Sequence, residues 1–481
     1  MDFQSPDLAS ANSEIFLLVM ICIVMLADLF AGSKNRYLVF VLSLAALAGS
    51  ALLTFMDFSV SPVLTLSGMF IDDILSDTLK LMIYPTVALV LIYSRTYLDA
   101  RGLMRGEFFS LALFATLGMM VMVSAAHLIT LYLGLELLSL SLYAMVSLQR
   151  DSVIATEAAI KFFVLGSLAS GFLLYGMSML YGATGSLHTA EIASVIRSDV
   201  SDHTVLVVGL VFIVAGLSFK LSAVPFHMWA PDVYQGAPTA VTLFIGSAPK
   251  LAAFGFIMRL LVEGLGDMVA DWQGMLVLLA VASMAVGNIA AIAQTNIKRM
   301  LAYSTISHMG FVLLGFVAAG TDGYSASLFY VIAYVLTTLG AFGTVMLLSR
   351  EGFEADALSD FKGLNQRNPW LALIMMFVML SMAGIPPMIG FYAKLSVLQA
   401  ALAAGYLWIV VVAVMLSLIG AFYYLRIIKF MYFDEADITH PIKSAPEIRL
   451  MISMNGLAII LLGIFPQMLM NLSLGAVLSG Q

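Results

Sequence analysis

The chain has 481 residues, of which 62% are hydrophobic and only 11% are charged, whereas a soluble domain carries roughly 25% charged residues. A soluble protein of this length cannot withdraw so much apolar surface from water. The single cysteine, Cys22, excludes iron–sulfur clusters, cysteine zinc sites and an internal disulfide. The net charge of −7, with no basic patch, argues against nucleic acid as a partner. The composition therefore predicts a protein that spans the membrane many times.

Each membrane-spanning helix needs about 20 apolar residues, and fourteen stretches of the chain meet this requirement. No connection between them is long enough for a separate soluble domain, so we expect an all-α polytopic membrane protein. The N-terminus is acidic and lacks the positive region of a secretory signal, so the first stretch is expected to be a retained span. The predicted spans are 14–31, 37–55, 79–94, 108–124, 127–148, 158–181, 205–230, 240–261, 275–294, 300–319, 326–348, 370–403, 406–431 and 450–474.

The basic residues orient these spans, because loops rich in lysine and arginine favour the cytoplasm. With the N-terminus outside, only three basic residues, Lys80, Arg197 and Arg259, fall on the outer side. Fifteen fall in inner loops, so we expect both termini on the outer side. The inner set is Lys34, Arg36, Arg95, Arg101, Arg105, Arg150, Lys298, Arg299, Arg350, Lys362, Arg367, Arg426, Lys429, Lys443 and Arg449.

Six titratable residues within the predicted spans are of particular interest. A charge at the centre of the bilayer is rare unless it faces water or protein, so these residues are candidates for ion or proton movement. Lysine suits protons better than sodium ions, because a cation site requires oxygen ligands, whereas a desolvated lysine can release its proton. The candidates are Glu136, Lys161, Lys220, Lys250, His308 and Lys394.

Structural roles are the alternative at four of these positions. Lys161 lies near the inner end of its span, where a long side chain can extend to the interface. His308 can be a hydrogen-bonded packing residue, and Glu136 with Lys220 can form an ion pair between helices. Lys250 and Lys394 have no obvious carboxylate partner on their own helices, which favours a functional role for both.

Two of the predicted spans should be broken beside a lysine. The seventh contains FKLSAVPFHMWAPDVYQGAPT, in which Pro225 removes a backbone donor shortly after Lys220. The twelfth contains SMAGIPPMIGFYAKL, in which the 384–387 segment should interrupt the helix next to Lys394. Unpaired backbone at membrane depth is tolerated only where protein or a water-filled cavity surrounds it. We therefore expect a cavity at each break.

The broken spans are five apart, an odd number, so they cross the membrane in opposite directions. This offset predicts two inverted five-helix repeats, made of helices 4–8 and 9–13. The chain is therefore predicted to contain four regions. Helices 1–3 occupy 1–107, the first repeat 108–261, the second repeat 275–431, and the C-terminal loop with helix 14 occupies 432–481.

The motifs resemble a known family. FKLSAVPFHMWAPDVYQGAPT with the following SAPK, GLELLSLSLYAMVSL around Glu136 and LAYSTISHMG around His308 are similar to the antiporter-like membrane subunits of respiratory complex I, the NADH:quinone oxidoreductase. The resemblance covers about residues 70 to 430. Among these subunits the chain is most similar to the type that carries a lysine in helix 12 and ends shortly after helix 14.

The resemblance implies a proton-translocating subunit of the membrane arm, in the plasma (inner) membrane of a bacterium. It assigns the family's helix 5–helix 7 pair to Glu136 and Lys220, and the helix-6 lysine to Lys161. Lys250 and Lys394 match the lysines of helices 8 and 12. The histidine of helix 10, His308, is expected to lie on the same axis.

The resemblance also implies that this chain holds no cofactor of its own. NADH, FMN, iron–sulfur clusters and quinone would be bound by partner subunits, and the partners would be the other membrane-arm subunits and the lipid bilayer. Two alternatives remain at this point. One is a subunit of a multisubunit cation/proton antiporter or membrane-bound hydrogenase, and the other is a structural or assembly subunit without its own conduction.

Overall fold

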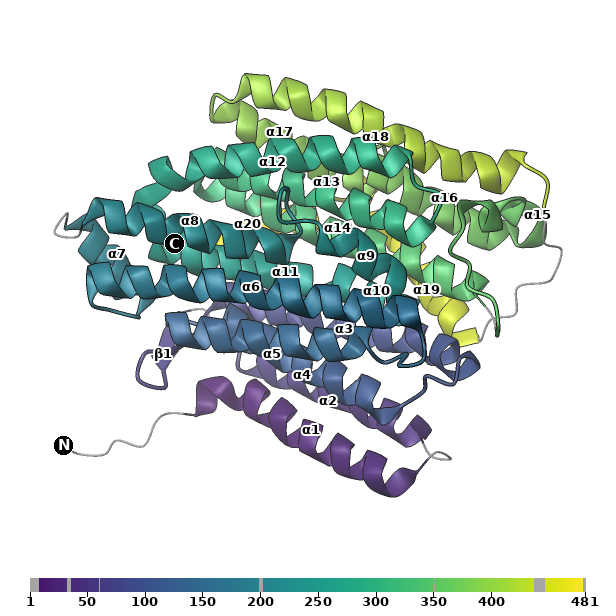
Figure 1. Cartoon of the computed structure of the whole chain (residues 1–481), viewed down its shortest axis with the longest axis horizontal. Coiled ribbons are helices and arrows are strands. Elements are labelled where there is room, and N and C mark those ends of the chain that lie inside the picture. Colours follow the sequence, from purple (N-terminus) through teal and green to yellow (C-terminus); the bar gives the residue numbers. More distant parts are fainter. Residues whose placement is uncertain are drawn as a thin grey trace.

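The computed structural model describes residues 8–32, 36–59, 61–198, 202–349, 351–436 and 446–478. Most of these residues are helical, and the long helices run side by side, from α1 at one edge of the bundle to α18 at the other (Figure 1). In this described part of the chain, 13 helices are long and apolar enough to cross a membrane. The predicted class, an all-α polytopic membrane protein, is therefore confirmed.

The first helices are α1 (Asn12–Ala31), α2 (Arg36–Met56) and α3 (Ile74–Ala100). A short antiparallel hairpin of β1 (Val63–Thr65) and β2 (Phe70–Asp72) connects α2 to α3. The hairpin is missing from the predicted elements, because three-residue strands carry too little alternation to be recognised. The next helices are α4 (Gly106–Val123), α5 (Leu128–Val146), α6 (Val153–Thr184) and the short α7 (Thr189–Arg197).

The remaining bundle contains both continuous and interrupted helices. The continuous ones are α12 (Val269–Ile292), α13 (Ile297–Ala318), α14 (Gly320–Leu348) and α18 (Leu407–Phe433). The interrupted ones are α8 (His203–Leu221) with α9 (Trp229–Gly236), α10 (Thr239–Gly246) with α11 (Ala248–Ile257) and the π-helical η2 (Met258–Gly264), α16 (Pro369–Ala383) with α17 (Ile389–Ala403), and α19 (Pro446–Ile464) with α20 (Gln467–Leu478). Short connecting turns are η1 (Ala9–Ala11), η3 (Gly266–Met268), η4 (Leu358–Phe361) and α15 (Leu364–Arg367).

Both predicted breaks are confirmed. The seventh span ends as α8 at Leu221 and resumes as α9 at Trp229, with Pro225 between them. The twelfth ends as α16 at Ala383, where Gly384 adopts the left-handed conformation with φ +83°. The helix bounds do not test the inverted repeats or the division of the chain into four regions, so both stay predictions.

Two further spans, expected to be continuous, are also interrupted. The eighth breaks at Ser247, between α10 and α11, and the fourteenth breaks between α19 and α20. A proline accounts for each break, because Pro249 and Pro466 lack the N–H that would continue the helix. The SAPK segment therefore contained the signal for the first of these breaks.

Lys80 and Arg259, which the charge count assigned to the outer side, are buried inside the bundle. Each side chain is only 1% exposed and belongs to a buried ion pair. Lys80 Nζ lies 2.8 Å from a Glu14 carboxylate oxygen, which ties α3 to α1. Arg259 binds Asp73 at 2.7 Å and Glu263 at 2.6 Å. Glu263 lies four residues after Arg259, a spacing that favours pairing on a helix. Glu14 and Asp73 are distant in the sequence, and no local pattern indicates that they pair with Lys80 and Arg259.

Asp73 caps the N-terminus of α3 and accepts a hydrogen bond from the Ser76 backbone N–H at 2.8 Å. Burial alone would raise the pKa of the Asp73 carboxyl, but the charge and hydrogen bonds of Arg259 outweigh it and hold that pKa below its ordinary value. The carboxylate therefore stays ionised and keeps Arg259 paired.

Lys298, expected in an inner loop, is also buried, with 4% of its surface exposed. Its ammonium donates a hydrogen bond to the Ala237 carbonyl at 3.0 Å, at the end of α9. Three other members of the inner set, Lys34, Arg350 and Lys443, lie outside the described residues. The bundle alone does not show which of its ends faces the cytoplasm, so the placement of both termini on the outer side stays a prediction.

Helices α4 and α5 approach each other closely at a pair of glycines. A Cβ atom on Gly134 would lie 2.7 Å from the Met122 backbone nitrogen and 2.8 Å from the Gly118 carbonyl oxygen. The same contact seen from α4 places a Gly118 Cβ 2.7 Å from the Gly134 carbonyl oxygen. Small residues permit such close packing between membrane helices, and here they position α5, which carries Glu136.

Replacing Gly134 with alanine should push α4 and α5 apart, because the added methyl group meets backbone atoms. We expect G134A to destabilise the subunit by about 1–3 kcal/mol and to lower the melting temperature of the purified complex. The matched control is G171A in α6, where nothing lies within 4 Å of an added Cβ. Equal melting temperatures for the two variants would contradict this packing account.

Candidate functional site

Glu136 and Lys220 are joined through a serine. The half-buried Glu136 on α5 accepts a hydrogen bond from the Ser170 hydroxyl of α6. Lys220, in the last turn of α8, donates to Ser139 Oγ at 2.8 Å and to Ser170 Oγ at 3.4 Å. Ser170 therefore accepts from the ammonium and donates to the carboxylate at the same time. The predicted pair exists as a hydroxyl-bridged pair.

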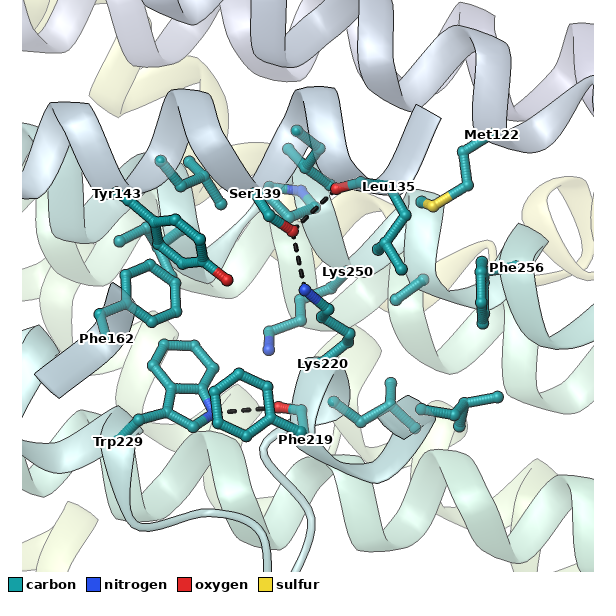
Figure 2. A pocket seen from close by; sticks show the side chains of 17 residues that line it. Met122, Leu135, Ser139, Tyr143, Phe162, Phe219, Lys220, Trp229, Lys250 and Phe256 are labelled. Carbon is teal, nitrogen blue, oxygen red and sulfur yellow. Dashed lines mark hydrogen bonds between the residues drawn. The ribbon is translucent and has the colours of Figure 1, made fainter. Parts of the chain in front are cut away.

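Lys220 and Lys250 both reach into one small cavity between α5, α6, α8 and α11 (Figure 2). Its volume is about 50 Å³, and a single water needs only about 10–15 Å³ of such space. The walls are largely apolar, and the two amines with Ser139 and Tyr143 supply the polar groups. The cavity therefore has both the room and the hydrogen-bonding partners that buried water requires.

Lys250 is 2% exposed and lies in the first turn of α11, directly after the break at Ser247. Its ammonium contacts Ser222 Oγ at 3.5 Å and lies 6.0 Å from the centre of the Trp229 ring. Both partners are neutral. A buried ammonium with only neutral partners is poorly suited to holding helices together, because its charge is not compensated.

Trp229, whose indole is a common interfacial anchor, is instead 3% exposed inside the bundle. Its ring stacks on Phe162 at 4.5 Å, and its N–H donates to the Phe219 carbonyl at 2.9 Å. The Phe219 carbonyl, in the last turn of α8, also accepts from the Ser222 backbone N–H at 3.0 Å. Trp229 therefore adds a second hydrogen bond to the end of α8, and its ring forms part of the cavity wall.

Lys394 occupies the second break in a related manner. Its ammonium donates to the carbonyl of Ala383, the last residue of α16, at 3.0 Å, and to Ser417 Oγ at 2.9 Å. A Cβ on Gly384 would lie 2.8 Å from the Lys394 side chain, so the glycine leaves room for the lysine as well as permitting the turn. Lys220 likewise lies at the C-terminal end of a half-helix. Such ends carry partial negative charge, which favours a cation.

His308 lies in a group of tyrosines between α13, α14 and α18. Its Nδ1 is 2.7 Å from the Tyr330 hydroxyl, and its Nε2 is 3.0 Å from the Tyr424 hydroxyl. The ring is 6% exposed. The Tyr334 hydroxyl nearby bonds to Thr305 at 2.8 Å. A histidine between two hydroxyl groups can act as a packing residue or pass a proton, because each ring nitrogen can donate or accept.

The Tyr234 hydroxyl is fully buried between the two groups of residues and has no hydrogen-bond partner. Its ring lies 6.5 Å from Trp229 on one side and 6.2 Å from Phe342 of α14 on the other. The Thr305 and Tyr334 hydroxyls are its nearest polar neighbours, and buried hydroxyl groups are nearly always hydrogen-bonded. Tyr234 therefore lies beside Trp229, which lines the cavity, and beside Tyr334, which lies next to His308.

Lys161 is not brought to the cavity. Its side chain is 43% exposed and forms ion pairs at 2.8 Å with both Glu157 and Asp232. Asp232, on α9, also binds Arg299 at 2.6 Å. The lysine therefore lies in an ion-pair network between α6, α9 and α13.

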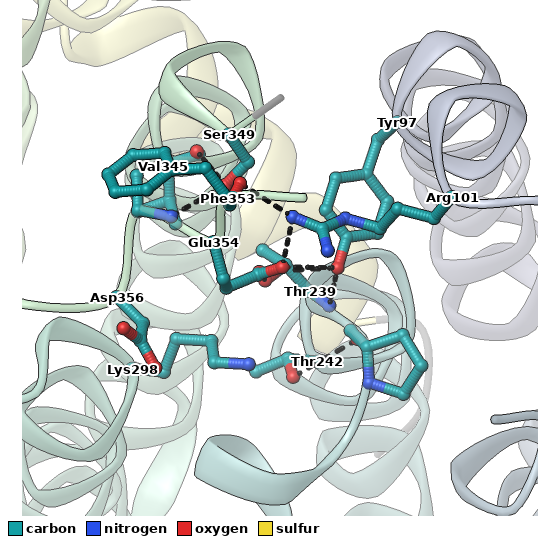
Figure 3. A network of polar contacts seen from close by, with 12 residues as sticks. Tyr97, Arg101, Thr239, Thr242, Lys298, Val345, Ser349, Phe353, Glu354 and Asp356 are labelled. Carbon is teal, nitrogen blue, oxygen red and sulfur yellow. Dashed lines mark hydrogen bonds and ion pairs between the residues drawn. The ribbon is translucent and has the colours of Figure 1, made fainter. Parts of the chain in front are cut away.

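A second polar network fastens the loop after α14 to the ends of α3 and α10 (Figure 3). Arg101 pairs with Glu354 at 2.5 Å, and Tyr97 donates to the same carboxylate at 3.0 Å. The Thr239 hydroxyl, at the start of α10, also donates to Glu354. This network anchors the half-helix that precedes the Lys250 break.

The structure therefore gathers five predicted residues into two groups. Glu136, Lys220 and Lys250 form the first. His308 and Lys394 form the second, because Lys394 Nζ lies 5.4 Å from the centre of the Phe311 ring, which stacks on the His308 partner Tyr330. Ser139, Ser170, Tyr330 and Tyr424 were missed. Ser139 lies one turn after Glu136 on the same helix, a spacing that was visible in the sequence. The partners from other helices carried no such signal.

Among the described residues, no group of His, Cys, Asp and Glu side chains is suited to hold a metal ion.

Comparison with known proteins gives the family to which the chain belongs. The family model described as "NADH:quinone oxidoreductase/Mrp antiporter, TM" matches residues 125–420. A solved chain of respiratory complex I from Thermus thermophilus with bound aureothin is 31% identical with a TM-score of 0.81, and the match covers 95% of this chain and 98% of that one. A chain of the Mrp complex from Dietzia sp. is 22% identical with a TM-score of 0.85, covering 98% and 97% of the two chains. The latter identity shows a shared fold alone.

The curated relatives are much closer in sequence. NADH-quinone oxidoreductase subunit N of Nitrosomonas europaea is 76% identical over 477 residues, which cover 99% of both chains. The corresponding subunit N of Thiobacillus denitrificans is 63% identical over the same length. The chain therefore belongs to the NADH-quinone oxidoreductase subunit N family, within the antiporter-like membrane subunits of respiratory complex I.

Proposed function

We propose that this chain translocates protons as a membrane-arm subunit of NADH:quinone oxidoreductase in the bacterial inner membrane, with both termini on the periplasmic side. The observation that carries the proposal is the small cavity into which Lys220 and Lys250 both point, with Lys220 linked to Glu136 through Ser170. A structural role does not explain why two amines line one cavity.

The Ser170 bridge lets the charge of Glu136 control Lys220. An ionised Glu136 draws the Ser170 hydrogen toward itself and leaves the serine oxygen free to accept from the ammonium. When Glu136 is neutralised or displaced, Lys220 loses that support. An unsupported ammonium in low-dielectric surroundings is unfavourable, so its proton then passes through cavity water to the Lys250 amine, which is in its neutral form when it accepts.

From the cavity the proton passes to Lys250 and then toward the second group of residues. Tyr234 lies between the cavity and the tyrosines around His308, and Lys394 lies at the far break. The proposed order is Glu136 with Lys220, Lys250, His308 and Lys394. Uptake occurs from the cytoplasm through helices 4–8, and release occurs through helices 9–13.

The driving reaction takes place in other chains. In this proposal NADH, FMN, the iron–sulfur clusters and quinone are bound by partner subunits, and the other membrane-arm subunits transmit the signal. A displacement or charge change beside half-buried Glu136 is the form that signal takes, because α5 presents this carboxylate partly outside the chain's own core. Lys161 takes part through its pairing with Asp232 on α9, by setting the position of that half-helix.

Replacing either cavity lysine with methionine tests the relay, because methionine keeps an apolar side chain of similar length without a titratable group. We expect K220M and K250M to lose most proton pumping and much coupled NADH:quinone turnover in sealed membrane vesicles, while the complex still assembles. The control is K429M, which removes an exposed lysine of α18 that pairs with Asp434. Normal pumping by assembled K220M and K250M complexes would instead support a structural subunit.

Replacing Ser170 with alanine tests the bridge without removing a charge. Loss of a hydrogen bond to a charged group costs about 1.5–3 kcal/mol, which corresponds to roughly tenfold or more if it falls on the rate-limiting step. We therefore expect S170A to slow pumping by about tenfold or more. The matched control is S141A, whose hydroxyl bonds only to the Leu137 carbonyl of its own helix. A proton-pumping rate for S170A equal to that for S141A would remove Ser170 from the relay.

A further inference from the structure

A groove runs between α2, α3 and α19, away from the lysine cavity. Its volume is about 200 Å³, many times the roughly 10–15 Å³ that one water needs. The walls are apolar and come from all three helices. They are formed by Phe40, Leu44, Ile92, Ile448 and Met451.

A pair of opposite charges stands at the mouth of this groove. Arg95 of α3 contacts a Glu447 carboxylate oxygen of α19 at 3.1 Å. The arginine also lies over two aromatic rings of α2, 4.9 Å from the centre of Tyr37 and 5.6 Å from that of Phe40. These contacts hold the guanidinium in place over the groove.

The pair is available to a second partner. The side chains of Arg95 and Glu447 are 36% and 54% exposed, and an exposed ion pair of this kind contributes little to stability. Arginine has five N–H donors in a planar fork that matches a phosphate group. The contact with Glu447 leaves donors of Arg95 free, and it leaves the other carboxylate oxygen of Glu447 free as well.

A positive and a negative group beside an apolar groove complement a zwitterionic phospholipid. The phosphate fits Arg95, a primary ammonium fits Glu447, and an acyl chain fits the groove. A headgroup with no amine would bring a second negative charge to Glu447 without compensation. A trimethylated ammonium has no N–H to donate to the carboxylate. The chemistry therefore selects a primary amine.

We propose that this groove binds one phosphatidylethanolamine, with its phosphate on Arg95 and its ammonium on Glu447. The site lies at the end of the bundle that the basic loops assign to the cytoplasmic side, which places the lipid in the inner leaflet. The bound lipid fills the space between α2, α3 and α19 and joins the first three helices to the C-terminal one.

The test uses the intact purified complex in nanodiscs that contain equal amounts of phosphatidylethanolamine, phosphatidylcholine and phosphatidylglycerol with identical acyl chains. After partial removal of lipid, mass spectrometry gives the retained amount of each. We expect the E447Q complex to lose preference for phosphatidylethanolamine over phosphatidylcholine by about threefold relative to the wild type. Its retention of phosphatidylglycerol should rise. Because other lipid sites are common to both complexes, the difference reports on this groove.

Two further variants complete the design. R95Q should retain less of the phosphate-bearing lipids in general, because it removes the phosphate partner. D434N should behave as the wild type, because it breaks an exposed ion pair with Lys429 on α18, away from the groove. Unchanged lipid ratios in an assembled E447Q complex would overturn the proposal. A wild-type preference for phosphatidylglycerol that R95Q abolishes would also overturn it, because the site would then recognise an anionic lipid.

Discussion

The low dielectric of the membrane interior is the constraint on which this structure depends. Neither a free carbonyl group nor an uncompensated charge is stable there. At the second break one residue meets both requirements, because the Lys394 ammonium donates to the Ala383 carbonyl at the end of α16. The carbonyl end of that half-helix in turn stabilises the ammonium. At the first break the two tasks are divided, because Lys220 in the final turn of α8 donates to Ser139 and Ser170, whereas the Trp229 N–H donates to the Phe219 carbonyl.

The buried charges fall into two classes by the partners that they have. Lys80 and Arg259 are matched by carboxylates at 2.8 and 2.7 Å, and such pairs fix helices in place. Lys250 and Lys394 contact only neutral hydroxyl, carbonyl and aromatic groups among their described contacts. A group that is held without a counter-charge can change its protonation state without breaking an ion pair, which is the property a proton carrier needs.

The sequence predicted features that a single helix encodes. Pro225 and Gly384 mark breaks locally, and the placement of Lys220 and Lys394 beside them follows from spacing alone. The burial of Lys80 and the serine between Glu136 and Lys220 depend on contacts from other helices, which no local pattern contains. Pro249 was a local signal that the apolar length of the eighth span concealed. Subunit membership was accessible because the motifs around the breaks are specific to the family.

The central claim is that Lys220 and Lys250 exchange a proton through water in a shared cavity. Cryo-electron microscopy of the assembled complex, at a resolution that reveals individual waters, tests this most directly. The account predicts ordered water between the two amines and continuous hydrogen bonding from Ser170 through Lys220 to Lys250. A dry cavity, with the two lysines turned toward separate carboxylates, would contradict it.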